Sequence, residues 1–405
     1  MTTTQKWTFA VAPPISDIRR SFRRADVHRR IPTIFHLIFA APCLYVLART
    51  LVPLTLPWWA KAAVAVLLLV ASQYHYWSRL SSGSVFAPEF PRAVVILFNW
   101  AFGAIVLLAL LQFLLDLGSL AAVLVQRRGV TLPDNVRYSA AGLAAILAAI
   151  GVSNAIRVPP IKDLEITIRD LPAAFDGYQL LQLTDLHISR LFPERWARAV
   201  VERANASGVD LIVVTGDFID GSVAMRRVDI APLRDLQAPD GVYAIPGNHE
   251  YFFDYVAWMR HLAGIGMRML PNAHTVLSRN GARLVLAGVT DLSAPASGHP
   301  GPNLAAALAG APRDVPILLL DHQPKNAARA AANGVALQLS GHTHGGMIVG
   351  LDRLVARGNN GYVSGRYKCG GMTLYVSNGT ALWPGFALRL GRPSELTRIT
   401  LRARQ

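Results

Sequence analysis

The chain has 405 residues, 52% of them hydrophobic, and a positive mean hydropathy of +0.32. This composition excludes an ordinary soluble protein, so part of the chain is expected to lie in lipid. The formal net charge of +15 favours anionic headgroups over nucleic acid as a partner, because no basic stretch carries interleaved stacking aromatics. Cys43 and Cys369 form no credible disulfide framework or metal cluster.

The first segment, residues 1–30, is basic. It carries seven Lys and Arg residues against two Asp residues, and the positive-inside rule therefore predicts a cytoplasmic N-terminus. Within it, Arg19 and Arg20 faintly resemble a twin-arginine export signal. That alternative would place the rest of the protein on the opposite side of the membrane.

Four apolar runs come next, each close to or above the roughly 20 residues that a helix needs to cross a bilayer. They are residues 31–51, 58–77, 93–115 and 139–156. The alternative of buried helices in a soluble domain is disfavoured, because so many successive runs with few interior charges are rare outside membranes. The sequence predicts four transmembrane helices over residues 31–157, which return the chain to the cytoplasm. Arg79 and Arg92 agree with this orientation, whereas Arg127, Arg128 and Arg137 disagree mildly.

The composition changes at Val158, Pro159 and Pro160, a conformationally restricted linker that follows the apolar region. The remaining residues, 158–405, suit one domain. Short runs rich in Val, Ile and Leu recur in it and are typical of buried strands. They are residues 178–183, 211–214, 242–245, 284–289, 317–320, 337–339, 374–376 and 397–401. With a crossover helix expected over 196–206, the pattern predicts an α/β sandwich.

Candidate metal ligands follow five of these runs. Asp185, Asp217, Asn248, His322 and His342 each come shortly after a run ends. Because sites in α/β sheets form beyond the carboxyl ends of strands, all five are expected at one rim. Their oxygen and nitrogen donors are sufficient for two divalent cations.

The segments that carry these ligands differ in specificity. They are Asp185-Leu186-His187, Gly216-Asp217, Gly247-Asn248-His249-Glu250, His322, and Gly341-His342-Thr343-His344. Singly, each has a structural alternative: a surface loop, a turn or a core histidine. Their order and spacing together favour a metal site. A phosphate ester repels hydroxide, so its hydrolysis needs cations that neutralise charge and lower the pKa of bound water. The sequence thus predicts a phosphoryl-transfer hydrolase in which Asp217 bridges two metals.

This ordered set resembles the calcineurin-like metallophosphoesterase superfamily over roughly residues 175–405. Gly-Asp-Phe-Ile-Asp-Gly at 216–221, Ser-Gly-His-Thr-His-Gly-Gly at 340–346 and Tyr-Val-Ser-Asn-Gly at 375–379 are similar to its bacterial membrane-associated branch. That branch includes proteins that act on phosphodiesters and on the diphosphate of UDP-diacylglucosamine. The resemblance implies a metallophosphoesterase-type β-sandwich flanked by helices over residues 158–405.

The resemblance also implies two metal sites that share one carboxylate. The ligands of the first site are Asp185, His187, Asp217 and His344. The ligands of the second site are Asp217, Asn248, His322 and His342. His249 would sit beside the scissile phosphate, stabilising charge or protonating the leaving oxygen, and a metal-bridging hydroxide would be the nucleophile. Mixed oxygen and nitrogen ligation suits Mn²⁺, Fe and Zn²⁺, and the family favours Mn²⁺.

Four further positions have two interpretations each. Asp321 either tunes His322 from behind or caps a strand. Arg366, Arg389 and Arg392 either bind substrate phosphate or are solvated surface charges.

Fusion to membrane helices favours a lipid-linked phosphoester or pyrophosphate, because a tethered site meets amphiphilic phosphates at high effective concentration. The sequence therefore predicts a multi-pass protein of the cell (inner) membrane with a cytoplasmic catalytic domain, whose partners are the membrane and a phosphoester. The alternative is a non-catalytic membrane sensor or transporter whose domain binds metal or a nucleotide.

Overall fold

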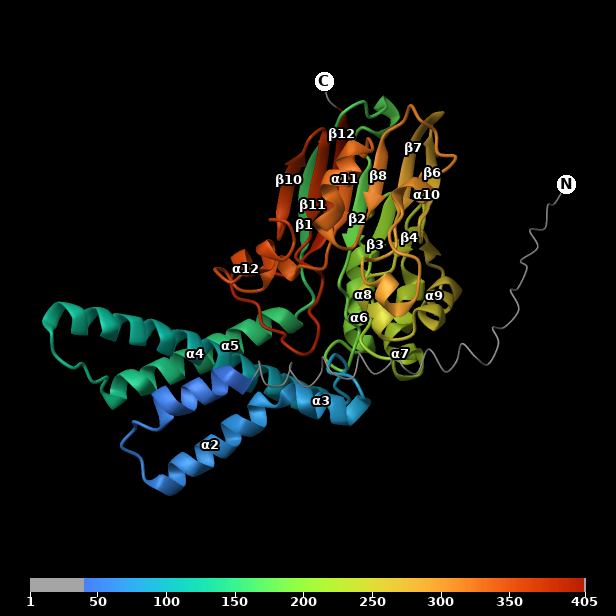
Figure 1. Cartoon of the computed structure of the whole chain (residues 1–405). Helices are drawn as coiled ribbons and strands as arrows, with labels where there is room; N and C mark the ends of the chain where they lie inside the picture. The colour runs from blue at the N-terminus through green and yellow to red at the C-terminus, as the bar shows by residue number, and fades with distance from the viewer. Residues whose placement is uncertain (1–39, 404–405) are drawn as a thin grey trace, which may run out of the picture.

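The computed structural model describes residues 40–403 (Figure 1). The basic segment 1–30 and the beginning of the first apolar run lie outside the described residues. Residues 161–403 are built around two six-stranded sheets. Figure 1 shows them packed as two layers, with helices on their outer faces and a group of long helices at one end.

The first sheet has the strand order β1-β12-β2-β3-β4-β5. Its strands are β1 (Ile161–Ile168), β12 (Leu396–Ala403), β2 (Gln179–Leu183), β3 (Leu211–Thr215), β4 (Val242–Ile245) and β5 (Arg268–Met269). Strands β2 to β5 are parallel, while β12 runs antiparallel to β2 and parallel to β1. The carboxyl ends of β2, β3 and β4 therefore meet at one edge.

The second sheet has the order β10-β11-β9-β8-β7-β6. Its strands are β10 (Gly365–Cys369), β11 (Met372–Val376), β9 (Leu337–Ser340), β8 (Ile317–Leu320), β7 (Ala282–Gly288) and β6 (Ala273–Arg279). The four inner strands are parallel and the two outer strands are antiparallel to their neighbours. Each sequence run predicted as a strand forms one, so the predicted α/β sandwich is confirmed.

The hydrophobic core lies between the sheets, because alternate side chains of each strand face opposite sides. On β2, Leu180 faces the space between the sheets while Leu181 faces the outer helices. Leu211 and Val213 of β3 face inward and meet Leu318 and Leu337 of the second sheet. Every one of these side chains is fully buried. The short strands are thus apolar on both faces, as parallel strands covered by helices must be.

Seven helices accompany the sheets. They are α6 (Glu194–Asn205), α7 (Val223–Ile230), α8 (Asn248–Phe252), α9 (Tyr255–Gly264), α10 (Leu304–Ala307), α11 (Ala327–Ala332) and α12 (Asp352–Arg357). α6, the predicted crossover helix, packs Trp196, Val200 and Ala204 on the outer face of the first sheet. Helices α10 and α11 cover the second sheet with small apolar side chains.

The apolar N-terminal region is helical, but two of the four predicted spans differ from expectation. By length and composition, two helices among residues 40–403 can cross a membrane: α4 (Arg92–Gln126) and α5 (Asp134–Ile156). The run predicted at 58–77 is broken at Gln73 into α2 (Trp58–Ser72) and α3 (Tyr74–Ser82). α2 has 15 residues and is only about 22 Å long, less than the roughly 30 Å of a bilayer core.

The first predicted run, 31–51, is helical from Ala40 to Leu51 in its described part, which is also shorter than a span. The prediction of four transmembrane helices is therefore met by two helices in the described chain. The length of the apolar run 58–77 did not indicate the break at Gln73. Next to this break, the Ser72 hydroxyl donates a hydrogen bond to the carbonyl of Leu69 at 2.8 Å.

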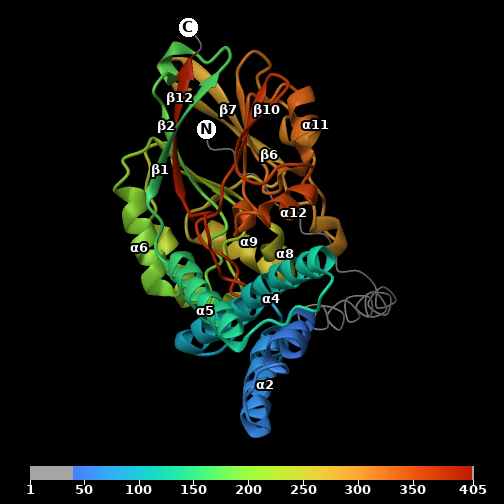
Figure 2. The ribbon, with the colours of Figure 1, turned by 90° about the vertical axis from the view of Figure 1, so that its left-hand side faces the viewer.

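A loop of the sandwich is inserted among the long helices. It spans residues 381–390, after β11, and packs Leu388 against Gly103 of α4 and Gly151 of α5, where a Cβ would collide with it. Asn99 of α4 donates to the carbonyl of Pro384 at 2.8 Å and accepts the amide of Ala387 at 2.6 Å. Figures 1 and 2 both show α4 and α5 at the end of the sandwich where α8 lies.

Candidate metal centre

Five short connections after parallel strands bring the candidate ligands to one rim. Asp185 follows β2, Asp217 follows β3 and Asn248 follows β4, while His322 follows β8 and His342 follows β9. Each stands two or three residues beyond the last residue of its strand. Both sheets therefore contribute side chains to the same end of the sandwich, which is the end that faces the long helices (Figure 1).

An uncommon backbone conformation marks these connections. Five candidate ligands have positive φ: Asp185 (53°), His187 (42°), Asp217 (55°), His342 (69°) and His344 (50°). Only a few per cent of non-glycine residues adopt such angles, and they persist where the surroundings hold them, often at functional sites. The positive φ turns each side chain back toward the rim instead of onward along the strand.

Neighbouring glycines permit the close approach of these connections. Gly216 has φ +92°, and a Cβ there would lie 2.5 Å from the backbone nitrogen of Gly247. A Cβ on Gly341 would collide with the Thr184 hydroxyl and the Asp185 carboxylate. Side chains larger than glycine would thus force the ligand-bearing loops apart.

The donor atoms form three overlapping groups, in which His187 belongs to the first two and Asp217 to the last two. Those groups, each within 4.8 Å, are Asp185 with His187 and His344, His187 with Asp217 and His249, and Asp217 with His322 and His342. Asn248 adds an amide oxygen 3.1 Å from His322 Nε2 and 2.9 Å from His342 Nδ1. All eight site residues predicted from the sequence are thus brought together, and Asp217 stands between two sets of donors.

Electron-pair acceptors face one another in this cluster. His322 Nδ1 lies 2.7 Å from the carbonyl oxygen of Thr215, so Nδ1 carries the hydrogen and a neutral ring has its lone pair on Nε2. That Nε2 lies 3.2 Å from Asp217 Oδ2 and 3.1 Å from Asn248 Oδ1, which are also acceptors. Such a meeting of acceptors needs a proton or a cation between them. The residues present therefore fit a divalent cation.

Among the candidate ligands, two buried ring nitrogens have no hydrogen-bond partner within the described residues: His187 Nε2 and His344 Nδ1. Both residues are buried, and burying an unpaired polar atom costs about 1–3 kcal/mol. His187 Nε2 lies 3.8 Å from Asp217 Oδ2 and 4.0 Å from Asp185 Oδ1, the spacing that a coordinated ion would occupy. This second set of donors also suits a cation.

Asp220 supports the site from behind. Its carboxylate lies 3.0 Å from His187 Nδ1 through one oxygen and 2.5 Å from His249 Nδ1 through the other. Each ring therefore presents its Nε2 to the Asp217 side, where His249 Nε2 lies 4.0 Å from Asp217 Oδ2. Asp220 thereby sets the orientation and tautomer of both rings.

Glu250 supports the backbone of the site. Its carboxylate accepts hydrogen bonds from the amides of Gly247, Asp217 and Phe218 at 2.7, 3.1 and 2.8 Å. It thereby joins the connection after β4 to the one after β3. The sequence interpretation assigned no role to Asp220 or Glu250, although both stand in the segments it quoted, Gly-Asp-Phe-Ile-Asp-Gly and Gly-Asn-His-Glu.

The electrostatics of the cluster are strongly coupled. Burial would raise the pKa of Asp217, but the charges of His322 and His249 outweigh it and hold that pKa well below its ordinary value. Burial would lower the pKa of His249, whereas the carboxylates of Asp217 and Asp220 raise it to about 9. Burial, followed by the charge of His322, lowers the pKa of His342 to about 3. At neutral pH Asp217 is therefore ionised and His342 is neutral. Burial would lower the pKa of His322, but the charge of Asp217 raises it well above its ordinary value, so a cation bound there must displace a proton from this ring.

The structure shows the surroundings of the four residues that had two interpretations each, Asp321, Arg366, Arg389 and Arg392. Asp321 is not the hydrogen-bond partner of His322 Nδ1, which faces the carbonyl of Thr215 at 2.7 Å. Arg366 is exposed and donates to the carbonyl of Glu165. Arg392 pairs with Asp352. Arg389 is not a solvated surface charge: it is 1% exposed and donates to the carbonyl of the candidate ligand His344 at 3.0 Å.

A sandwich of two mixed sheets with this donor set defines the class of metal-dependent phosphoester hydrolases. The family model of the calcineurin-like phosphoesterases matches residues 178–346. An uncharacterised metallophosphoesterase of Bacillus subtilis is 30% identical over 281 residues, which cover 66% of this chain and 95% of that protein. The chain belongs to the calcineurin-like phosphoesterase family.

Two longer relatives carry a descriptive name. A protein of Bos taurus called transmembrane protein with metallophosphoesterase domain is 33% identical over 274 residues, covering 64% of this chain. Its namesake of Danio rerio is 32% identical over 269 residues, again covering 64% of this chain. In both cases the chain spans 61% of the relative's length. Among solved structures, a dimetal phosphatase of Danio rerio is 16% identical with a TM-score of 0.31, covering 51% of this chain and 88% of that one.

Proposed function

We propose that this protein is a membrane-anchored phosphoesterase that uses two divalent cations to hydrolyse a phosphodiester or pyrophosphate of a lipid-linked substrate. The observation that carries the proposal is the position of Asp217 between two sets of buried donors. In this proposal Mn²⁺ is the preferred metal. The ligands are Asp185, His187, Asp217, Asn248, His322, His342 and His344.

Cations held there would neutralise phosphate charge and lower the pKa of a bound water. The protein's own residues supply the remaining requirements. Asp185 accepts the backbone amide of His342 through both oxygens at 3.1 Å, which fixes the distance between the first and last metal-binding segments. Asp217 accepts the amide of His249 at 2.9 Å, so the shared carboxylate and the proposed catalytic ring are held as one unit.

His249 is the proposed proton donor to the leaving oxygen. Burial lowers the pKa of His249, but the carboxylates of Asp217 and Asp220 raise it above its ordinary value, which favours the protonated ring. Asp220 accepts the Nδ1 hydrogen, so that the Nε2 hydrogen remains for transfer. The His249 ring packs edge-on against His187 at 4.6 Å between centroids.

Aromatic side chains beside His249 support an apolar leaving group. Phe86 meets His249 edge-on at 5.4 Å between ring centroids and stacks on Phe252 at 5.2 Å, while Trp383 lies 5.5 Å from Phe86. Phe252 is 46% exposed and the other two are half-buried, so their faces are open to a ligand. Phe86 comes from the loop between α3 and α4, outside the family's sandwich.

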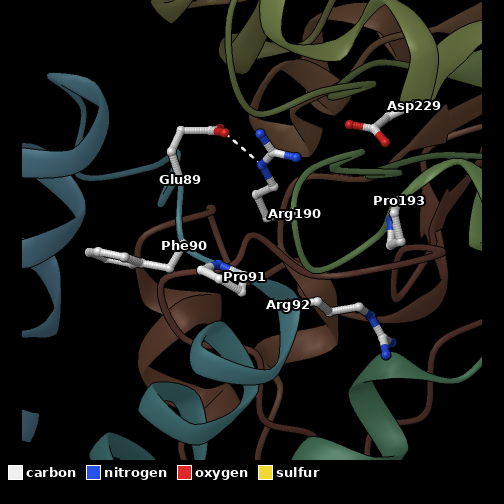
Figure 3. A pocket seen from close by; sticks show the side chains of 7 residues that line it. All are labelled: Glu89, Phe90, Pro91, Arg92, Arg190, Pro193 and Asp229. Carbon is white, nitrogen blue, oxygen red and sulfur yellow. Dashed lines mark hydrogen bonds and ion pairs between the residues drawn. The ribbon is translucent and has the colours of Figure 1, made fainter.

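This loop is tethered to the sandwich by ion pairs. Glu89 pairs with Arg190 at 2.7 Å, as Figure 3 shows, and also with the fully buried Arg226. Arg226 in turn donates to the backbone carbonyl of Asp220 at 2.8 Å. The segment that leads into α4 is therefore connected directly to the residue that orients His249. Membrane and active-site elements share this set of contacts.

Membrane anchoring by α4 and α5 is the second part of the proposal. Arg92 at the start of α4 donates to the carbonyl of Leu191, and Ile156 at the end of α5 packs against the core of the first sheet, so both helix ends contact the sandwich. One hairpin would therefore return the chain to the side from which it entered. The names of the bovine and zebrafish relatives favour this reading. We propose the cell membrane, with the sandwich in the cytoplasm, as its location.

The test of function is hydrolysis by the full chain, purified in detergent and loaded with Mn²⁺. Bis(p-nitrophenyl) phosphate and a lipid pyrophosphate in mixed micelles are the substrates. Asp217→Ala is expected to abolish both reactions together with metal binding. His249→Ala is expected to abolish them while metal content, measured by inductively coupled plasma mass spectrometry, is largely retained.

The matched control is Asp163→Ala, an exposed carboxylate on the edge strand β1 that pairs with Arg398. It should keep turnover within about twofold, as surface substitutions usually do. Turnover of the aryl diester without any lipid substrate would remove the lipid part of the proposal. Metal binding without hydrolysis of either substrate would favour the sensor.

A further inference from the structure

A cavity lies where α5 leaves the apolar region. It has a volume of about 370 Å³ and is lined by residues from the end of α5, its exit linker and the chain before β12. The polar members of the lining are Asn154, Arg157, Arg389, Arg392 and Ser394. Three of these five residues are cations. The cavity is formed by the helix end and the sandwich together.

Several polar atoms of the lining residues have no partner within the described chain. They are Arg389 Nε, Arg392 Nε and Ser394 Oγ, and all three atoms are buried. Arg389 is 1% exposed and Ser394 is 5% exposed. Leaving a buried donor unpaired costs free energy, and buried polar groups are almost always satisfied by protein, water or ligand. Three such atoms around one cavity indicate a ligand that accepts hydrogen bonds.

Few carboxylates pair directly with the cations of the cavity, although the charges of Asp185 and Glu395 act on Arg389 from a distance. The Arg389 guanidinium donates only to backbone carbonyls in the described structure, those of His344, Arg392, Asn378 and Ala381. Arg392 has one carboxylate partner, Asp352, and Arg157 donates to the hydroxyl of Ser153. Two of the three guanidinium groups therefore have no carboxylate partner. An anion would satisfy them, and phosphate oxygens match guanidinium geometry.

The position of the cavity selects among anions. On α5 an exposed apolar stripe runs through Leu143, Ile146 and Ile150, which are 46%, 60% and 47% exposed. The same helical face continues through Asn154 to Arg157, because residues three and four apart are neighbours on a helix. At a rise of about 1.5 Å per residue, Arg157 stands about 10 Å beyond Ile150. A lipid whose acyl chains lie on this stripe would place its phosphate at the cavity.

We infer that this cavity binds the phosphate of an anionic membrane phospholipid. The inference rests on the membrane anchoring proposed above and not on hydrolysis. Arg389 would link the bound lipid to the candidate metal centre. Its side chain lines the cavity and also donates a hydrogen bond to the carbonyl of His344. Its backbone amide also donates to the carbonyl of Gly151 on α5 at 2.9 Å.

The test is lipid retention by the full chain, released from nanodiscs of phosphatidylcholine with phosphatidylglycerol and analysed by native mass spectrometry. Arg157→Gln combined with Arg392→Gln should lower phosphatidylglycerol retention about tenfold, which corresponds to about 1.4 kcal/mol. Ser394→Ala should lower it several-fold. Because the Ser394 hydroxyl has no partner in the described chain, its loss should leave thermal stability unchanged. Phosphatidylcholine retention should not change.

The matched control is Arg127→Gln combined with Arg128→Gln, two exposed cations at the far end of the same helix pair. An equal loss in this control would show diffuse charge attraction and overturn the inference, as would full retention in both cavity variants. Displacement of the lipid by millimolar inorganic phosphate would make free phosphate the ligand and overturn the lipid assignment. Hydrolysis of bis(p-nitrophenyl) phosphate in the same samples reports separately on the proposed enzyme.

Discussion

Asp220 offers a sharp test of how the site is organised, because one buried carboxylate holds two imidazoles. Its oxygens lie 3.0 Å from His187 Nδ1 and 2.5 Å from His249 Nδ1. In Asp220→Asn one oxygen is replaced by an amide NH₂ group, which cannot accept the hydrogen of the facing ring. That ring must change its tautomer or turn away. Either His187 or His249 then presents the wrong atom to the Asp217 side.

The expected loss follows from what each ring is proposed to do. Substituting a residue that orients a metal ligand typically costs about 10–100-fold in metal affinity or activity. Because Asp220 orients both the proposed ligand and the proposed acid, we expect kcat to fall about 100-fold, or about 2.7 kcal/mol in the barrier. Asp163→Asn, an exposed carboxylate paired with Arg398, is the control and should keep kcat within about twofold.

The pH profile distinguishes orientation from general damage. The charge of Asp220 contributes to raising the pKa of His249 to about 9. A general acid is active while protonated, so activity is lost as pH rises through this pKa. Removing the charge lowers the pKa, and the alkaline limb of kcat should move to lower pH by about one unit or more. Unchanged kcat and an unchanged alkaline limb in Asp220→Asn would refute the assigned role.

Three further outcomes are expected. Gly341→Ala should lower Mn²⁺ content and the melting temperature, because the added Cβ would collide with Thr184 and Asp185. Overpacking of this kind costs about 1–3 kcal/mol. The control Gly264→Ala should change neither quantity, because no atom lies within 4 Å of a Cβ at that position. Glu89→Gln should reduce turnover of lipid substrates more than turnover of bis(p-nitrophenyl) phosphate, because it releases the loop that carries Phe86; equal loss on both substrates would contradict this role for the loop. Chelation with EDTA should abolish activity and lower the melting temperature, and added Mn²⁺ should restore both. The reason is that a ligand at 100 times its dissociation constant stabilises the folded state by about 2.7 kcal/mol. A melting temperature that is unchanged by EDTA would argue against bound metal.

The central strands could be predicted because burial on both faces makes them continuous apolar runs. β4 and β8 have the predicted bounds, Val242–Ile245 and Ile317–Leu320. β1, at a sheet edge, was missed because Ile161–Ile168 alternates exposed charged residues with apolar ones. β10, at the edge of the other sheet, has only five residues and contains Arg366 and Lys368. Edge strands carry no run that composition alone can detect.

The metal-binding segments could also be predicted, because each ligand follows a recognisable strand. The supporting residues could not, since their partners are far away in sequence. Asp220 holds a ring 33 residues earlier, and Glu250 binds a backbone amide at the same separation. Arg389 was misjudged for the same reason: its burial depends on the loop that carries it packing among α4, α5 and the connection after β9. Local sequence contains no signal for such contacts.

The most direct measurement is the number and spacing of metal ions in crystals of the Mn²⁺-loaded protein, located by anomalous scattering. Two peaks about 3.5–4 Å apart, both within coordination distance of the Asp217 carboxylate and lost in Asp217→Ala, are the predicted result. One peak or none at Asp217, with the histidine side chains placed as they are here, would contradict the dinuclear centre and the hydrolase built on it.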